Sequence, residues 1–115
     1  MGKDTLRIKG DIIVTVEDKR KYDYDISGSA GRYAFRATIF DMRVKHGIMG
    51  SRVASLEMWR AKKTLIGSIR VFPVVRCKHG QWSLRPHSKK DLKACCALFD
   101  NLDKRSPKTS GITMF

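Results

Sequence analysis

The sequence has few cysteines, few acidic residues and no long apolar run. Its three cysteines are an odd number and two are adjacent, which does not suit a disulfide framework. No stretch approaches the roughly 18 to 20 apolar residues of a membrane-spanning helix. The charged N-terminal residues lack the apolar segment that follows the charge in a secretory signal. We therefore expect a cytoplasmic protein with no membrane partner.

The size and composition of the chain indicate one domain. The 115 residues are 42% hydrophobic and 30% charged, enough to bury a single core and too apolar for a disordered chain. We expect one domain over residues 1–105 and a loose C-terminal tail over 106–115.

The order of polar and apolar residues predicts a largely antiparallel sheet. Alternation and β-branched residues indicate strands near 11–17, 22–27, 32–40, 52–60 and 65–75, with a short strand over 82–84. The small residues 28–31 suit a hairpin loop, and residues 61–64 suit a short turn. Because Pro73 lacks an amide donor, its strand is expected to lie at a sheet edge or to end there.

One helix is predicted near the C-terminus, over about 89–104. Ser88 can cap its N-terminus, with Asp91 three residues later, and Leu92, Cys95, Phe99 and Leu102 recur at helical spacing. The expected fold class is therefore α+β: an antiparallel sheet of about five strands with one C-terminal helix packed on one face.

The positive charge is concentrated in the middle of the chain. Lys and Arg number 24 against 11 acidic residues, a net charge of +13, and residues 42–93 hold thirteen of these cations with only Glu57 and Asp91. Such a block attracts polyanions, although a solvated lysine-rich face is the alternative. The candidate anion-binding residues are Arg43, Lys45, Arg52, Arg60, Lys62, Lys63, Arg70, Arg76, Arg85, His87, Lys89, Lys90 and Lys93.

Two features within this block suggest how an anion could be held. The free amides and the positive dipole end of the predicted helix lie beside Arg85, Lys89 and Lys90, so a phosphate could bind there, unless these side chains simply extend into water. Trp59 and Trp82 could stack on bases beside the arginines, although a tryptophan in a small sheet also belongs in a core. No motif of a sequence-specific nucleic-acid reader is present.

Metal and catalytic sites are not indicated. The spacing of Cys77, His79, His87 and Cys95 matches no zinc motif, so neither a metal nor another cofactor is predicted. Asp23, Asp25 and Asp41 could serve magnesium chemistry or form a solvated face. No catalytic residues are predicted, and enzymatic activity is not indicated.

Residues 37–56 carry a pattern of apolar residues and glycines. The order is Ala37-Thr38-Ile39-Phe40, then Gly47-Ile48, then Gly50-Ser51-Arg52-Val53 and Leu56. It resembles a small uncharacterised family of phage-encoded proteins with Ala-x-Val-Phe, Gly-Ile, Gly-Arg-Ile and Leu. The resemblance implies a sheet with a C-terminal helix and a phage or mobile-element origin, and it implies no activity.

The sequence therefore predicts a small, basic, non-catalytic protein that binds RNA, DNA or a nucleotide, and the resemblance implies an accessory role in a phage or mobile element, with the host cytoplasm as its location. The alternative is a basic inhibitor or adaptor that docks on an acidic surface of a partner protein.

Overall fold

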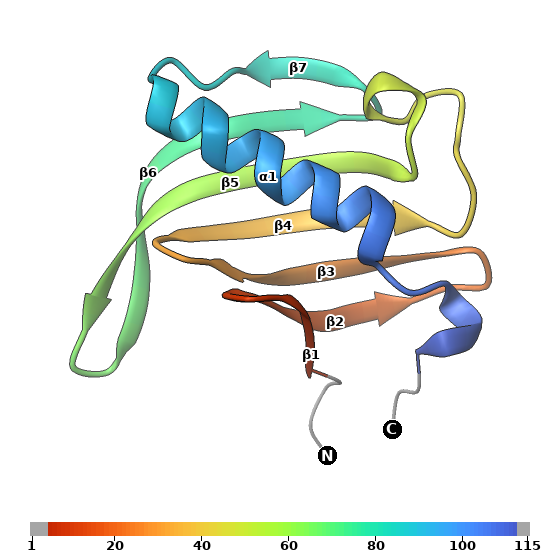
Figure 1. Cartoon of the computed structure of the whole chain (residues 1–115), viewed down its shortest axis with the longest axis horizontal. Helices are drawn as coiled ribbons and strands as arrows, with labels where there is room; N and C mark the ends of the chain where they lie inside the picture. The colour runs from red at the N-terminus through yellow and green to blue at the C-terminus, as the bar shows by residue number, and fades with distance from the viewer. Residues whose placement is uncertain (1–4, 113–115) are drawn as a thin grey trace.

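The computed structural model describes residues 5–112, except for the side chains of Lys63 and Ser68. Seven antiparallel strands form one open sheet in chain order, and one α-helix crosses one of its faces (Figure 1). The elements are β1 (Thr5–Lys9), β2 (Ile12–Lys19), β3 (Asp23–Ala30), β4 (Tyr33–Phe40), β5 (Val53–Thr64), β6 (Gly67–Lys78), β7 (Gln81–Leu84) and α1 (Lys89–Arg105), with 3-10 turns η1 (Ile48–Gly50) and η2 (Thr109–Gly111). The α+β class, the antiparallel sheet and the C-terminal helix are confirmed.

The sheet has seven strands rather than about five. β1 was not predicted, because its five residues carry only Leu6 and Ile8 as apolar side chains between charged ones, and it is a strand because it pairs with β2. The short strand near 82–84 is β7. Residues 61–64 are not a turn: β5 continues through them to Thr64, and the chain reverses at Leu65 and Ile66.

The glycines near the β3–β4 connection have different roles from the predicted one. The turn is only Gly31 and Arg32, and Gly31 has a φ of +61° that other residues rarely adopt. Gly28 lies inside β3, where a Cβ atom would stand 2.0 Å from the carbonyl oxygen of Ile13 on β2. Glycine is therefore needed at residue 28 for close approach of two strands.

Pro73 interrupts the pairing of β6 without ending the strand. It faces Trp59 next to a shift in the β5–β6 register, and β6 continues to Lys78. β7 pairs only with Arg76, Cys77 and Lys78, so it does not pair with the part of β6 that contains Pro73. The proline thus occupies a local sheet edge, where a missing amide donor costs no ladder hydrogen bond.

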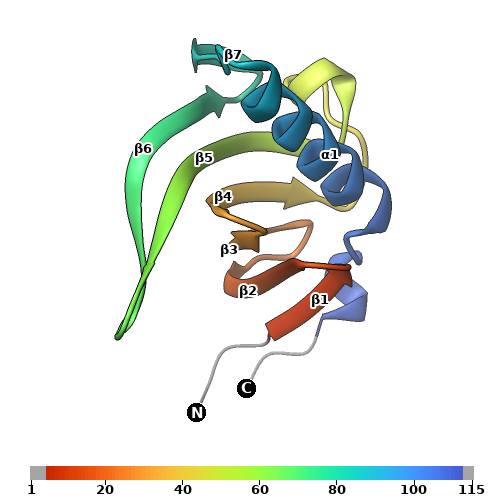
Figure 2. The same cartoon turned by 60° about the vertical axis from the view of Figure 1, so that its left-hand side comes forward.

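The core lies between α1 and the concave side of the curved sheet (Figure 2). Alternate residues of the strands point into it, among them Val14, Ile26, Phe35, Leu56 and Met58, all at most 2% exposed. The intervening residues of each strand point to the opposite side of the sheet.

The helix begins where the sequence predicts, with a different buried stripe. Ser88 caps it by accepting a hydrogen bond from the amide of Asp91 at 3.1 Å. Asp91, Cys95, Leu98 and Leu102 are the buried residues, whereas Leu92 is 50% exposed. The buried stripe therefore differs from the expected one at Asp91, whose carboxylate pairs with a cationic side chain on β5, and at Leu98.

The segment after the helix is packed as far as residue 112, in contrast to the expected loose tail. Thr109 donates its amide and hydroxyl hydrogens to the Asp41 carboxylate, both at 2.6 Å. The hydroxyl of Tyr24 donates to the carbonyl of Pro107 at 2.6 Å, and Ile112 is 2% exposed. The residues that make these polar contacts show no helical or strand-like spacing in the sequence, so the sequence does not predict the packing of this segment. Residues 113–115 lie outside the described part.

Residues 5–112 contain no helix with the length and apolarity needed to cross a bilayer.

Candidate functional site

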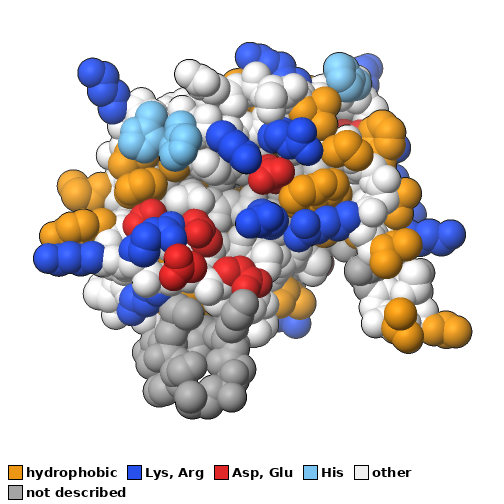
Figure 3. Space-filling view, turned by 180° about the vertical axis from the view of Figure 1, so that it is seen from behind, with side chains coloured by type: hydrophobic (Ala, Val, Ile, Leu, Met, Phe, Trp, Pro, Cys, Tyr) orange, Lys and Arg blue, Asp and Glu red, His pale blue; other side chains and the backbone are white. Residues whose placement is uncertain are grey.

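The face of the sheet opposite α1 carries a group of cations around one tryptophan. No helix within residues 5–112 covers this face, and Figure 3 shows Lys and Arg side chains interleaved with apolar ones on one part of it and acidic side chains gathered on another. We call five residues the open-face cluster: Arg36 on β4, Trp59 on β5, and Arg70, Arg76 and Lys78 on β6. The four cations are exposed and Trp59 is half-buried.

The strand register brings these side chains together. Arg36 lies opposite Glu57, and Glu57 lies opposite Arg76, so three adjacent strands present a row with one acid between two arginines. The Nε atom of Arg76 is 3.4 Å from the Glu57 carboxylate. Because residues two apart on a strand share a face, Trp59 lies beside this row and Lys78 beside Arg76.

The closest contact in the cluster joins Trp59 and Arg70. The Arg70 guanidinium carbon is 4.1 Å from the centre of the indole ring, a cation–π distance. Register shifts near Trp59 and Arg60 place Arg70 opposite Ala61, on the same face as Trp59. A β-bulge therefore directs this arginine onto the ring, which the alternation in the sequence does not reveal.

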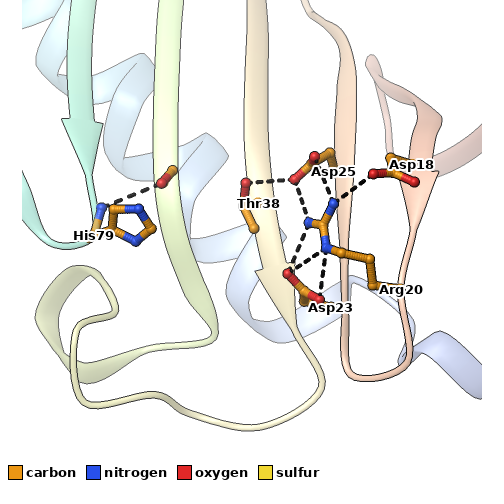
Figure 4. A network of polar contacts seen from close by, with 7 residues as sticks. Asp18, Arg20, Asp23, Asp25, Thr38 and His79 are labelled. Carbon is orange, nitrogen blue, oxygen red and sulfur yellow. Dashed lines mark hydrogen bonds and ion pairs between the residues drawn. The ribbon is translucent and has the colours of Figure 1, made fainter.

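The acidic part of the face is held within the chain. Arg20 donates hydrogen bonds to the carboxylates of Asp18, Asp23 and Asp25 at 2.8 to 3.1 Å (Figure 4). The hydroxyl of Thr38 donates to Asp25 at 2.7 Å. The Arg20 guanidinium lowers the pKa of Asp25 below its usual value. Asp23 and Asp25 therefore sit in an ion-pair network, and Asp41, the third acid considered for magnesium chemistry or a solvated face, accepts hydrogen bonds from Thr109.

Arg52 and Arg60 point away from the open face, to the helix side. Arg52 donates to the carbonyls of Phe40 at 2.8 Å, of Ser106 at 2.8 Å, and of Asp103 and Pro107 at 3.2 Å. It thereby fastens the end of α1 to the sheet. We correct its predicted role from anion binding to structural support.

Arg60 pairs with the carboxylate of Asp91 in the first turn of α1. Its Nε and terminal nitrogen lie 3.1 and 2.5 Å from the two carboxylate oxygens, and the hydroxyl of Tyr33 donates to the same carboxylate at 2.7 Å. Hydrogen bonds from Arg60, and then from Tyr33 and the capping region, lower the pKa of Asp91 to about 2. Asp91 is 3% exposed and supplies negative charge at the helix N-terminus from within the chain.

The cations near the helix entrance are on the opposite side of the molecule from the open-face cluster. Lys89, Lys90 and Lys93 are exposed on α1, and His87 is exposed just before it. Arg85 lies over the ring of Trp82, with its guanidinium carbon 5.3 Å from the ring centre. Trp82 packs partly against the core. The predicted cationic block is thus divided between two faces.

The remaining predicted cations lie at the ends of the sheet. Arg43 and Lys45 are exposed in the loop after β4, next to His46, whose ring contacts that of His79 at 5.5 Å between centres. Lys62 is exposed on β5, and the side chain of Lys63 lies outside the described part.

The far part of the β5–β6 hairpin projects beyond the sheet (Figure 1). We call residues 62–71 the hairpin overhang, because β4 pairs with β5 only as far as Arg60 and β7 pairs only with the far end of β6. Its large apolar side chains are unusually exposed: Leu65 at 106%, Ile66 at 98%, Val71 at 58% and Ile69 at 51%. In the sequence, these four apolar residues lie beside charged ones, which could have indicated an exposed hairpin. The turn predicted at 61–64 placed the chain reversal too early, so the overhang was not predicted.

Within the described residues, no group of three or more His, Cys, Asp and Glu side chains is placed to hold a metal ion. Cys77 and Cys95 are buried, and burial raises the pKa of the Cys95 thiol to about 11, which disfavours the thiolate that binds metals.

Comparison with protein-family models, with curated proteins and with solved structures finds no match.

Proposed function

We propose that this protein binds RNA or DNA through the open-face cluster and that binding involves no catalysis. The observation that carries the proposal is the stacked pair of Trp59 and Arg70, at 4.1 Å, on an uncovered sheet face with three further exposed cations. Arginine contacts phosphate and also stacks on bases, and tryptophan offers a ring for base stacking. The bases of a single-stranded segment or of a nucleotide are unpaired, so they can stack on such a ring.

The length of the cluster fits a strand of several nucleotides. Lys78, Arg76 and Arg70 lie along β6, and the eight steps from residue 70 to residue 78, at about 3.3 Å each, span roughly 25 Å. Arg36 widens the positive surface toward β4. A backbone laid along β6 would therefore meet cations at both ends of its contact, with Trp59 between them.

The charges of the face favour one placement of a polyanion. The cations lie over β4 to β6, whereas Asp18, Asp23 and Asp25 lie at the ends of β2 and β3. A phosphate backbone is attracted to the first area and repelled by the second. Glu57 within the cluster limits the attraction and holds Arg76 in place.

Two triple variants of equal charge test the proposal. Arg36, Arg70 and Arg76 are changed to Gln in the first, and Lys89, Lys90 and Lys93 to Gln in the second. Fluorescence anisotropy with a labelled single-stranded 12-mer of RNA or DNA measures affinity at several salt concentrations.

We expect the open-face triple to weaken binding at least about tenfold at low salt. Its slope of log affinity against log salt should become shallower by about 2, since each lost phosphate contact contributes about 0.7. The helix triple should change both far less. Equal losses of affinity in the two triple variants would refute a site on the open face. A larger loss of affinity in the helix triple variant would place the site at the helix entrance instead.

A second candidate function is docking on an acidic partner protein, and the hairpin overhang favours it. Leu65 and Ile66 are almost fully exposed, and a projecting apolar tip between basic residues suits a protein contact better than a phosphate backbone. Purified protein that carries excess absorbance at 260 nm, removable by high salt, supports nucleic acid. A preparation free of nucleic acid that retains one acidic protein supports docking. The accessory role in a phage or mobile element stays a prediction under either function.

A further inference from the structure

A cleft of about 300 Å³ opens on the helix side of the molecule, between α1, β7 and η1. It lies on the side of the sheet that carries α1 (Figure 1), opposite the open-face cluster. Its inner end reaches the buried residues Leu56 and Cys95, which are 1% and 5% exposed. The cleft is therefore a crevice between helix and sheet that leads to the core.

The walls and rim of this cleft are apolar. Trp82 and Phe99 are half-buried and face it from β7 and α1, while Leu92 and Met49 are 50% and 90% exposed at its rim. Leu92 stood in the predicted core stripe of the helix, and the space that a core would fill there is open. Apolar side chains that line an open space gain free energy when an apolar group replaces water there.

One cation stands in this apolar lining. Among the described residues that line the cleft, Arg85 is the one that carries a charge, and its guanidinium lies over the Trp82 ring at 5.3 Å between guanidinium carbon and ring centre. The stacking contact leaves the edge of the guanidinium, with its N–H donors, free to bind an anion. A volume of about 300 Å³ is at the lower end of the range for ligand pockets.

The rim also holds a backbone conformation that costs free energy. Met49 has a φ of +54°, a left-handed value that residues with a side chain rarely adopt, and Gly50 follows with +68°. Such conformations concentrate at ligand sites. Here the conformation presents the Met49 side chain at the mouth of the cleft.

We propose that this cleft binds a small amphipathic carboxylate, whose apolar body lies between Trp82 and Phe99 and whose carboxylate pairs with Arg85. The apolar walls select the body, the single cation selects a negative head group, and the volume limits the ligand to a short acyl chain or a single ring. The site is independent of nucleic-acid binding, because it lies on the other side of the sheet.

Three probes with the same eight-carbon body and different head groups test the charge selection: octanoate, octan-1-ol and octylammonium, each below its micelle concentration. The chain has only two tryptophans, so the two indole N–H signals in a ¹⁵N NMR spectrum report two places. Trp82 reports the cleft and Trp59 the open face. We expect octanoate to shift the Trp82 signal saturably, octan-1-ol to do so more weakly, octylammonium to bind least, and Trp59 to stay unchanged.

Arg85→Gln and the charge-matched control Lys93→Gln separate the specific contact from general charge. We expect Arg85→Gln to weaken the binding of octanoate about tenfold and to leave the binding of octan-1-ol unchanged, since a charge-assisted hydrogen bond is lost at a partly exposed site. Lys93→Gln should change neither. Equal binding of octanoate and octylammonium, equal losses in the two variants, or parallel shifts of both tryptophans would overturn the proposal.

A variant that fills the cleft gives a second test. Cys96 is exposed on α1 and lines the cleft, so a Phe side chain at this position can occupy the space without replacing a core residue. Cys96→Phe is expected to abolish the Trp82 response to octanoate while its thermal midpoint stays near that of the original protein. Octanoate binding that survives in a folded Cys96→Phe variant would place the ligand elsewhere and overturn the proposal.

Discussion

Replacing Asp91 with Asn should cost stability in a way that depends on pH. The carboxylate is 3% exposed and accepts hydrogen bonds from Arg60 and Tyr33, and the Arg60 contact lowers its pKa from 3.8 to about 2. Asparagine keeps the shape and can still accept from Tyr33, but it lacks the charge. A shift of this size corresponds to at most about 2.5 kcal/mol of folding free energy at neutral pH. Because the Arg60 side chain is 50% exposed and solvent screens it, we expect a loss of about 1 to 2 kcal/mol.

The sign of the pH dependence follows from the lowered pKa. The carboxylate stabilises the folded state fully above its unfolded pKa of about 4, and this contribution is lost as the pH falls through about 2. Urea unfolding of both proteins at several pH values measures it. The difference in unfolding free energy between Asp91→Asn and the original protein should be constant from pH 7 to about 5 and should shrink steadily toward pH 2.

An exposed acid on the same helix provides the control. Asp100 pairs with Lys104 at 2.9 Å, and both side chains are more than half exposed. Asp100→Asn should therefore cost less than about 0.5 kcal/mol. If both variants lose the same free energy of unfolding, or if the loss at Asp91 does not change with pH, the part-buried contact with Arg60 does not anchor the helix and the reasoning is refuted.

Three further predictions concern stability and solubility. Arg52→Met should lower the unfolding free energy by about 2 to 4 kcal/mol in urea titration, because four carbonyl groups, one at the end of β4 and three at or after the end of α1, each lose a hydrogen bond; a loss below about 0.5 kcal/mol would contradict that role. Gly28→Ala should cost more than about 2 kcal/mol, since the new Cβ would meet the Ile13 carbonyl at 2.0 Å, and an unchanged thermal midpoint would show that the strands can separate there. Leu65→Ser with Ile66→Ser should change stability by less than about 0.5 kcal/mol and reduce aggregation in light scattering, whereas a clear loss of stability would mean that the hairpin overhang packs on the domain.

The candidate site could be predicted only in part, because charge in sequence carries no information on which face a side chain takes. Arg70 and Arg76 do lie together on the uncovered face with Trp59, whereas Arg52 and Arg60 are used by α1 and its C-terminal segment. Arg36 and Lys78 were missed as members of the cluster. The alternation on β4 predicts the side of the sheet on which Arg36 lies, but the other members of the cluster are more than 20 residues away along the chain.

The sequence by itself determined the local structure of this protein. Period-two alternation specified most strands, Ser88 with the apolar residues after it specified the helix, and the surplus of Lys and Arg specified a positive surface. These properties depend on residues close together along the chain.

Only the tertiary structure decided which side chains meet. The β-bulge near Trp59 places Arg70 against its ring, Arg60 pairs with Asp91 on the buried side of the helix, and Leu92 lies beside an open cleft. Each outcome depends on contacts between elements distant in sequence, and neither propensity nor periodicity encodes such contacts.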